Sequence, residues 1–398
     1  MNFINSLKLK GFLSFPPESE EITLSSLNVI IGPNGSGKSN LIESLELLHA
    51  VPSAFASAIR DGGGAREWLW KGNNAQSSAS IEVNLRGLTP GRDLRYRLAF
   101  AAAGQRTEVI DEVLEDVEKK RSTEKDVFFY YRYQSGYPII NLREVKGKKA
   151  TEKRVERYLE RQSLLPDESV LSQRKDPDLY PELTWVGRNF SQIQMFREWG
   201  LGRYTEVRKP QPADLPSHIL LPDARNLGLV LNQLEHTDSG PEFNRLLSIF
   251  LPRYQRFSTL IQGGTVQFYL HEQGLKFPIP ATRLSDGTIR FMAILALLLS
   301  PDLPPLICIE EPELGLHPDA AVLLADLLVD ASKRTQLIVT THSDALVSAL
   351  TEQANSVLIC ENLQGTVLKR IDPSKLSYWL EQYRLGEIWR IGELGGNP

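Results

Sequence analysis

Four short motifs combine residue types that could bind and hydrolyse a nucleoside triphosphate. In chain order they are residues 32–39 (GPNGSGKS), 284–288 (LSDGT), 306–313 (LICIEEPE) and 341–343 (THS). Glycines followed by Lys-Ser can surround phosphate oxygens, and paired carboxylates can hold a metal ion or activate water. Any one of these motifs can arise by accident, but the ordered set predicts a nucleotide-hydrolysing site.

The glycine-rich loop has the context that phosphate binding requires. Residues 32–39 fit the pattern G-x-x-x-x-G-K-S, between an apolar strand expected at 27–31 and a helix whose apolar positions start at Leu41. A simple turn before a helix is the alternative, but this context favours binding of ATP or GTP on backbone N–H groups and the helix N-terminus. Lys38 would contact the β and γ phosphates, and Ser39 would ligate Mg²⁺. The predicted nucleotide-binding residues of this loop are Gly32, Asn34, Gly35, Ser36, Gly37, Lys38, Ser39 and Asn40.

Two further motifs place acids and a histidine at the ends of apolar strands. Glu310 and Glu311 follow the apolar run 306–309, and His342 follows the run 336–340. We expect Glu310 to hold the metal together with Ser39, and Glu311 to polarise the attacking water as general base. His342 is expected to contact the γ-phosphate. By themselves, a solvated acidic strand end and a structural histidine are the simpler interpretations.

The LSDGT motif begins a strongly apolar helix. Ser285 is a good N-cap residue, and the N-terminus of a helix favours an anion. From the motif alone, a phosphate contact and a plain capped core helix are equally consistent with these residues.

The spacing of apolar residues along the chain predicts the strands and helices that must position these motifs. Alternating apolar residues at 81–85, 94–100 and 109–113 predict an antiparallel sheet, continued by 127–133 and 137–141. Composition changes near residue 142, after which helical spacing is expected over 151–165 and in an aromatic segment at 185–199.

Regular structure is expected to resume at residue 219. Helices are predicted at 227–234 and 243–257, followed by a strand at 265–270. We therefore predict a head made of residues 1–141 and 218–398, with 142–217 as an insertion.

Composition excludes several classes of protein. The 398 residues carry a net charge of −4, so any nucleic-acid surface must be local. The longest apolar run, 291–299, is far shorter than the roughly 18 residues of a membrane span, and no signal-peptide pattern opens the chain. Cys308 and Cys360 lie in apolar runs and are expected to be reduced core thiols. A cytoplasmic protein without a membrane segment is predicted.

The motifs resemble those of ABC-type ATPases. LSDGT resembles the signature motif, ICIEEPELGLHPD the Walker B motif with its D-loop, and THS the H-loop. The sequence EEPELGLHP together with THS is similar to the SMC/RecF/OLD-like branch, particularly to bacterial AAA_21-type predicted ATPases. The resemblance is dense over 1–50 and 219–345. It implies an α/β ABC ATPase head with a P-loop mixed sheet, an antiparallel β lobe, a helical signature lobe and a mainly helical insertion in place of a coiled coil or lid.

The resemblance also implies a homodimer formed around ATP. Ser285, Asp286 and Gly287 would contact the γ-phosphate bound by the Lys38 loop of the other subunit. Asp286 replaces the usual glycine, a substitution that this branch tolerates. Arg290 either reaches the same phosphate or lies on the surface. The glutamine of the Q-loop has no clear counterpart, and Gln76 is a candidate by position only.

Spacing narrows the function within this branch. The gap between Ser39 and Ser285 is too long for a transporter subunit, a long coiled coil is absent, and the short segment after Ser343 has no motif for a fused nuclease. We expect an ATP-driven dimeric switch in DNA maintenance or repair, or in antiviral (anti-phage) defence, that acts with a separate effector protein. The candidate DNA contacts are Lys146, Lys148, Lys149, Lys153, Arg154 and Arg157. The alternative is a solvated helix face, in which the interleaved glutamates form ion pairs with these basic residues.

An alternative function belongs to a different class of protein. In it, ATP controls the assembly of a protein scaffold or sensor that does not bind DNA. Aromatic residues near the C-terminus could dock a partner, although a helix packed on its own head explains them more simply. These residues are Tyr378, Trp379, Tyr383 and Trp389.

Overall fold

The computed structural model describes residues 2–119, 126–134, 136–146 and 149–395. Its centre is a six-stranded sheet in the order β10-β15-β16-β3-β17-β18. Neighbouring strands are parallel except β17 and β18, which form an antiparallel pair. The strands are β3 (Leu27–Ile31), β10 (Gln194–Phe196), β15 (Leu306–Glu310), β16 (Gln336–Thr340), β17 (Val357–Asn362) and β18 (Thr366–Arg370).

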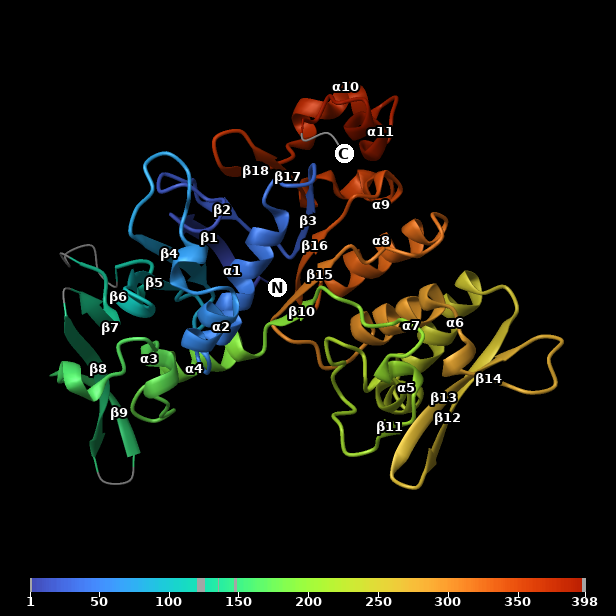
Figure 1. Cartoon of the computed structure of the whole chain (residues 1–398), viewed down its shortest axis with the longest axis horizontal. Coiled ribbons are helices and arrows are strands. Elements are labelled where there is room, and N and C mark those ends of the chain that lie inside the picture. Colours follow the sequence, from blue (N-terminus) through green and yellow to red (C-terminus); the bar gives the residue numbers. More distant parts are fainter. Residues whose placement is uncertain (1, 120–125, 135, 147–148, 396–398) are drawn as a thin grey trace.

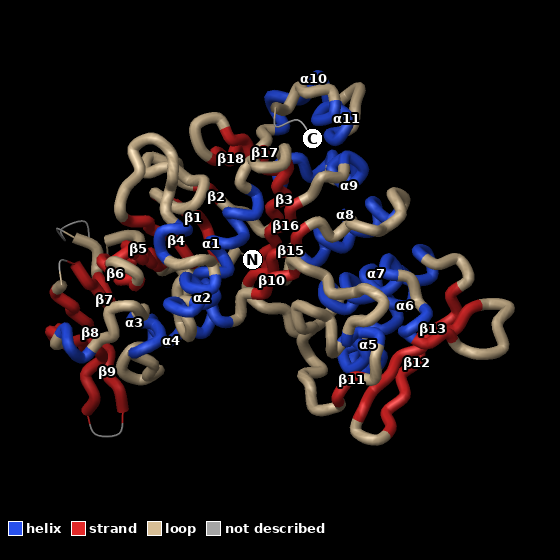
Figure 2. Tube along the Cα trace, in the orientation of Figure 1, coloured by secondary structure: helices blue, strands red, loops and turns tan. Residues whose placement is uncertain are grey.

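The central sheet separates two hydrophobic cores. Side chains of a strand alternate between its faces, so Ile30, Cys308 and Ile338 enter one core, while Val29 and Ile307 enter the other. Figures 1 and 2 show a β-rich lobe on one side of this sheet and a mostly helical lobe on the other. Both faces are covered, which explains why these strands are nearly continuous apolar runs in the sequence.

The β-rich lobe is an eight-stranded antiparallel sheet in the order β2-β1-β4-β5-β6-β7-β8-β9. The predicted alternation is confirmed in β4, where Ala79, Ile81, Val83 and Leu85 are buried. Helix α1 (Lys38–Ala50) contributes to the core that this sheet shares with the central sheet. The strands are β1 (Ile4–Lys10), β2 (Ile22–Thr23), β4 (Ser78–Leu85), β5 (Leu94–Ala103), β6 (Arg106–Asp116), β7 (Phe129–Gln134), β8 (Tyr137–Lys146) and β9 (Lys149–Tyr158).

The helix expected over 151–165 is wrong. Strand β9 occupies most of this range and pairs antiparallel with β8, with Val155 opposite Leu142. Val155 and Tyr158, which set the helical spacing, are 42% and 70% exposed and mark no buried face. Pairing with an available edge strand therefore outweighed a local pattern.

The described part of 142–217 is mixed rather than mainly helical. Helix α4 (Pro181–Ser191) matches the start of the expected aromatic helix, but the chain then enters strand β10 of the central sheet. The remaining short elements before residue 218 are α2 (Phe55–Asp61), α3 (Val170–Gln173), β11 (Gln211–Pro212) and the 3₁₀ turns Ala65–Trp68, Arg161–Ser163 and Glu206–Arg208.

The helical lobe carries the LSDGT motif on α7 (Asp286–Leu298), whose residues from Ile289 to Leu298 are buried apart from Arg290. The helix predicted over 243–257 ends earlier than expected, because Pro252 cannot continue it and strand β12 begins at Tyr254. The lobe also contains α5 (Leu227–Glu235), α6 (Gly240–Phe250), β12 (Tyr254–Gln262), β13 (Thr265–Glu272), β14 (Ile279–Pro280) and the 3₁₀ turn Ala281–Arg283.

The C-terminal part packs on the same side of the central sheet as the helical lobe. Trp389 is fully buried in that core, so this aromatic residue belongs to the head itself, whereas Tyr378 and Tyr383 are exposed. Among the described residues, no helix is both long and apolar enough to span a bilayer. The elements are α8 (Ala320–Ala331), α9 (Asp344–Ala349), α10 (Ser377–Leu380), α11 (Leu385–Arg390) and the 3₁₀ turns Thr351–Ser356 and Pro373–Leu376.

Candidate functional site

The glycine-rich loop joins β3 to α1 and is packed too tightly for side chains at two of its glycines. A Cβ atom on Gly32 would lie 2.2 Å from the carbonyl oxygen of Cys360, and one on Gly37 would lie 1.9 Å from Oγ1 of Thr366. Gly37 also has a φ of 108°, which L-residues rarely adopt. The close approach of the β17–β18 pair therefore requires glycine at both positions.

Lys38 lies across its own loop. Its Nζ atom donates hydrogen bonds to the carbonyl oxygens of Gly32 at 2.7 Å and Pro33 at 3.0 Å. Burial lowers the pKa of Lys38, while the negative charges of Glu311 and Glu310 oppose this shift. The ammonium group is thus held at the loop, close enough to both acids to sense their charge.

Polar side chains brace the loop from outside, and two of them, Ser14 and Thr366, were not expected from the sequence. Thr366 Oγ1 lies within hydrogen-bond distance of the carbonyl oxygen of Ser36, at 2.8 Å, and of Ser14 Oγ, at 2.7 Å. Asn40 Nδ2 donates to the same Ser14 hydroxyl at 2.6 Å. The side chain of Asn40, expected at the nucleotide, therefore contacts Ser14. The hydroxyl of Ser36 is buried and has no hydrogen-bond partner among the described residues.

The two acids lie at the end of β15, where the parallel strands end: Glu310 is its last residue and Glu311 follows it. Glu310 pairs in register with Thr340 of the neighbouring β16. Burial raises the pKa of Glu310, whereas Arg197, with Nε 3.4 Å from Glu310 Oε1, opposes the shift. Arg197 also contacts Glu46 at 2.8 Å and Glu43 at 3.6 Å on α1. This arginine, which the sequence did not suggest, joins the strand of the acids to the helix of the loop.

Glu311 adopts a left-handed conformation with a φ of 45°, uncommon for a residue with a side chain. Its N–H donates to the carbonyl oxygen of Thr340 at 2.9 Å, and its Oε1 lies 3.7 Å from Nε2 of His342. Burial and the charge of Lys38 lower the pKa of His342, which favours the neutral imidazole. The acid, the histidine and the lysine thus share one site.

Glu313, the third acid of the EEPE segment, holds the histidine loop in place. It accepts a hydrogen bond from Thr341 Oγ1 and another from the N–H of His342 at 3.2 Å. Burial raises the pKa of Glu313. These contacts of Glu313 were not predicted, although a third acid close to two candidate site acids was an available signal in the sequence.

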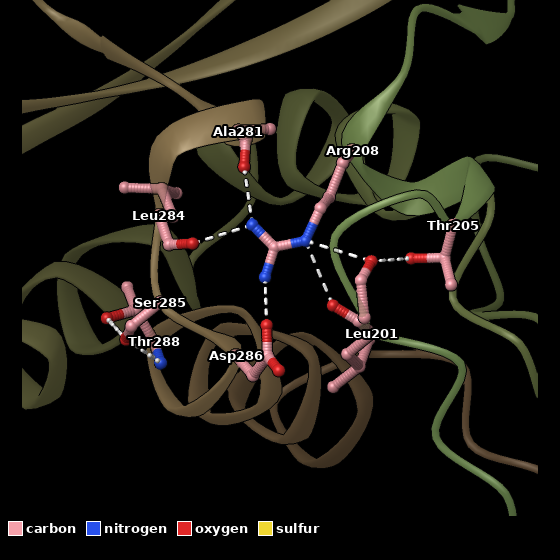
Figure 3. A network of polar contacts seen from close by, with 9 residues as sticks. Leu201, Thr205, Arg208, Ala281, Leu284, Ser285, Asp286 and Thr288 are labelled. Atoms are coloured by element: carbon pink, nitrogen blue, oxygen red, sulfur yellow. Dashed lines mark hydrogen bonds and ion pairs between the residues drawn. The ribbon is translucent and has the colours of Figure 1, made fainter.

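The signature segment is organised by Arg208 (Figure 3). Ser285 is the N-cap of α7, and its Oγ accepts a hydrogen bond from the N–H of Thr288 at 3.0 Å. Arg208 forms an ion pair with Asp286 and donates to backbone carbonyl groups on both sides. The start of α7 is therefore fixed by its own cap and by a side chain from the 3₁₀ turn Glu206–Arg208.

Two contacts connect the start of α7 to the loop after β15. A Cβ on Gly287 would lie 2.7 Å from the carbonyl oxygen of Gly315, so the two backbones are closely packed. Arg290 Nη1 donates to the carbonyl oxygen of Glu311 at 3.4 Å, and its guanidinium carbon lies 5.8 Å from the centre of the Trp199 ring. Arg290 is thus half-buried rather than on the surface, and it contacts the acidic loop of its own chain.

The Q-loop candidate and the candidate DNA contacts lie apart from these motifs in the sequence. Gln76 is exposed in the loop before β4. Arg154 forms an ion pair with Glu182 at 2.5 Å and lies over the Tyr130 ring, so its charge is already engaged. Arg157 is exposed on β9.

The lysines of the same stretch fall where the structure gives no side-chain description. Lys148 lies outside the described residues, as do the side chains of Lys146, Lys149 and Lys153. Their contact with DNA stays a prediction.

The geometry of the site agrees with a protein-family model that matches most of the chain. The AAA_21 family model, described as "AAA domain, putative AbiEii toxin, Type IV TA system", matches residues 27–348. This chain belongs to the AAA_21 family. The expectation of an ATPase of the SMC/OLD-like type is thereby confirmed, and all four motifs lie within the matched residues.

Two curated relatives of this AAA_21 ATPase match it over shorter stretches. The Old nuclease of Escherichia phage P2 is 28% identical over 165 residues, which cover 37% of this chain and 28% of the relative. The chromosome partition protein Smc of Thauera aminoaromatica is 32% identical over 99 residues, which cover 23% of this chain and 8% of the relative. The chain thus spans a minor part of the length of each.

Solved SMC head domains share the fold. An SMC head bound to the C-winged helix domain of ScpA has a TM-score of 0.55 at 13% identity, covering 94% of this chain and 99% of that one. A Pyrococcus furiosus SMC head with an extended coiled coil also has a TM-score of 0.55, at 12% identity, covering 96% and 99%. The expected ABC ATPase head is therefore confirmed as the fold.

Proposed function

We propose that this ATPase is a dimeric switch, in which two heads close around ATP and separate after hydrolysis. The observation that carries the proposal is the division of the site. The side chains of Ser285 and Asp286 contact Thr288 and Arg208, and within the described part of the chain neither forms a hydrogen bond or ion pair with the Lys38 loop. A second copy would supply a signature segment to the nucleotide. Lys38 lies close enough to Glu310, Glu311 and His342 for their charges to interact.

The residues at the sheet edge suit the steps of hydrolysis. Lys38 would bind the β and γ phosphates. Glu311 would accept a proton from the attacking water, and neutral His342 would orient that water. Ser39 and Glu310 would supply oxygen ligands of the kind that Mg²⁺ prefers. Apart from its ion pair with an arginine, Glu310 Oε1 is buried without a hydrogen-bond partner among the described residues, which fits a metal ligand. When bound, Mg²⁺ would neutralise phosphate charge.

We further propose that the switch acts in DNA maintenance or in defence against phage, with a separate effector, in the cytoplasm. The names of the relatives support this: a phage nuclease, a chromosome partition protein and a family described by a toxin system. Buried free thiols at Cys308 and Cys360 are compatible with a reducing compartment.

An ATP-controlled scaffold that does not touch DNA is the second candidate. It is favoured by the engagement of Arg154 with Glu182, which removes one of the proposed phosphate contacts. Tyr378 and Tyr383 are exposed near the C-terminus and could contact a protein partner.

The dimeric switch is tested by Glu311→Gln. Without the carboxylate base, we expect turnover to fall at least about a hundredfold, while ATP binding persists because the Lys38 loop is unchanged. The variant should therefore accumulate as a dimer with ATP and Mg²⁺ in sedimentation velocity, and remain a monomer with ADP. Glu352→Gln, an exposed glutamate in the turn after α9, is the matched control. A Glu311→Gln variant that hydrolyses ATP normally, or that stays monomeric with ATP, contradicts the proposal.

A further inference from the structure

Arg208 is a buried arginine that the hydrolytic site does not use. Its side chain is 3% exposed. Nε donates to the carbonyl oxygens of Leu201 at 2.9 Å and Gly202 at 3.2 Å, while Nη1 donates to those of Ala281 at 3.0 Å and Leu284 at 2.6 Å. A buried guanidinium is costly unless its donors are satisfied, so this arrangement fixes the main chain around it.

The remaining nitrogen of Arg208 points to the signature segment. Nη2 contacts Oδ1 of Asp286, in the first turn of α7 (Figure 3). Asp286 is 70% exposed, in contrast to the arginine beneath it. The ion pair therefore presents one face to the interior and its carboxylate to the surface where α7 begins.

A carboxylate at this point has two opposing effects. It stabilises the helix, because the N-terminus carries a partial positive charge. It also lies in the first turn of α7, near the helix N-terminus where an incoming phosphate would bind, and its charge repels that phosphate. An aspartate without a positive partner would thus weaken phosphate binding beside Ser285, whereas an arginine that neutralises the aspartate removes much of this repulsion.

We propose that Arg208 is the positioning residue of the LSDGT segment: it neutralises Asp286 and fixes the turn before Ser285, so that the start of α7 can accept the γ-phosphate held by a second copy of this chain. This role rests on the proposed ATP-closed dimer and adds a residue to it. It also connects the segment predicted as an insertion, from which Arg208 comes, to the dimer contact.

The two partners of the ion pair are expected to have opposite effects on dimerisation. Asp286→Ala removes the repelling carboxylate and leaves the guanidinium charge near the phosphate, so ATP-dependent dimerisation should tighten about threefold or more. Arg208→Met leaves the carboxylate unneutralised and frees the turn, so dimerisation should weaken at least about tenfold. Simple structural damage would weaken it in both variants.

The experiment uses Glu311→Gln as parent, with sedimentation velocity over a protein concentration series in ATP and Mg²⁺. Lys209→Met is the matched control, because Lys209 adjoins Arg208 but forms its ion pair with exposed Glu206. Its dimer constant should stay within about twofold of the parent. Binding of a fluorescent ATP analogue to dilute monomer should be equal in all variants, because the Lys38 loop is untouched.

Asp286→Ala decides the matter even if Arg208→Met does not fold, because Asp286 is exposed. Tightening supports the inference, and unchanged or weaker dimerisation of a folded Asp286→Ala protein overturns it while leaving the dimeric switch intact. A parent that does not dimerise with ATP overturns both. Where Arg208→Met folds, adding Asp286→Ala should recover part of the lost affinity; no recovery would refute the neutralising role.

Discussion

At the scale of single residues, the site depends on side chains that act through others. Glu311 and His342 are the residues that we propose for hydrolysis, but Glu313 holds the backbone of His342, and Arg197 holds Glu310 against α1. Such supporting residues fix the orientation of the reacting groups within the narrow limits that catalysis requires.

Glu313→Ala tests this support. The N–H of His342 and the hydroxyl of Thr341 would lose their acceptor, at a cost of about 1–3 kcal/mol for each buried donor. We expect kcat to fall at least about tenfold as His342 shifts, whereas the Kd for ATP should change less than about threefold because the Lys38 loop is separate. Steady-state kinetics and nucleotide titration measure the two quantities. Glu313→Gln, which keeps an acceptor, should recover much of the activity; equal loss in both variants would count against an orienting role.

At the scale of elements, a buried carboxyl group attaches helix α3 to the antiparallel sheet. Glu112 on β6 accepts hydrogen bonds from Tyr96 on β5, from Ser169 and from the N–H of Val170 at 2.9 Å. Burial raises the pKa of Glu112 from its ordinary 4.5 to about 7, with the hydrogen bonds opposing the shift. The folded protein therefore keeps this proton at pH values where the unfolded chain has released it.

Stability should consequently fall as pH rises. Between about pH 4.5 and 7 the folded state binds more protons at Glu112 than the unfolded state, which lowers the free energy of unfolding by up to about 3 kcal/mol across this window. Glu112→Gln keeps the shape and can still accept from Val170, so it should remove this contribution and stabilise the protein at pH 8. Urea unfolding at pH 5, 6, 7 and 8 measures the difference. Equal pH slopes in the two proteins would show that Glu112 does not titrate in this range.

The elements also explain why the prediction of a helix over 151–165 was wrong. The spacing of Val155 and Tyr158 fits a helix, but β9 completes the edge of the antiparallel sheet by pairing with β8. A strand forms its hydrogen bonds with a partner strand from another segment of the chain, and the local periodicity of a sequence does not show whether such a partner is present.

At the scale of the whole molecule, the central sheet brings motifs from both ends of the chain together. Its strand order places β3 beside β16 and β17, although β3 precedes them by most of the chain. The two cores then position the β-rich lobe and the signature lobe on opposite faces. The basic residues around β9 belong to the β-rich lobe, at the end of its sheet, and are remote in the sequence from every nucleotide motif.

The DNA hypothesis concerns the surface around β9. Replacing Lys149, Lys153 and Arg157 with alanine should weaken binding to a double-stranded DNA duplex at least about tenfold at low salt and reduce the salt dependence of binding. Fluorescence anisotropy across a salt series measures both effects. Absence of DNA binding by the unaltered protein at low salt would favour the scaffold alternative. A charge-matched control is alanine at three exposed lysines elsewhere, Lys276, Lys333 and Lys375.

The sequence alone determined that the chain is an ATPase, because the loop around Lys38, the acids at the end of β15 and the histidine after β16 can be recognised from a few adjacent residues and their flanking strands. It also determined the family and the α/β architecture through the order of these motifs. Tertiary structure decided the partners: Arg208 beneath Asp286, Arg197 between Glu310 and α1, and β9 beside β8. These contacts depend on burial and strand pairing between separate segments of the chain, which only the folded molecule establishes.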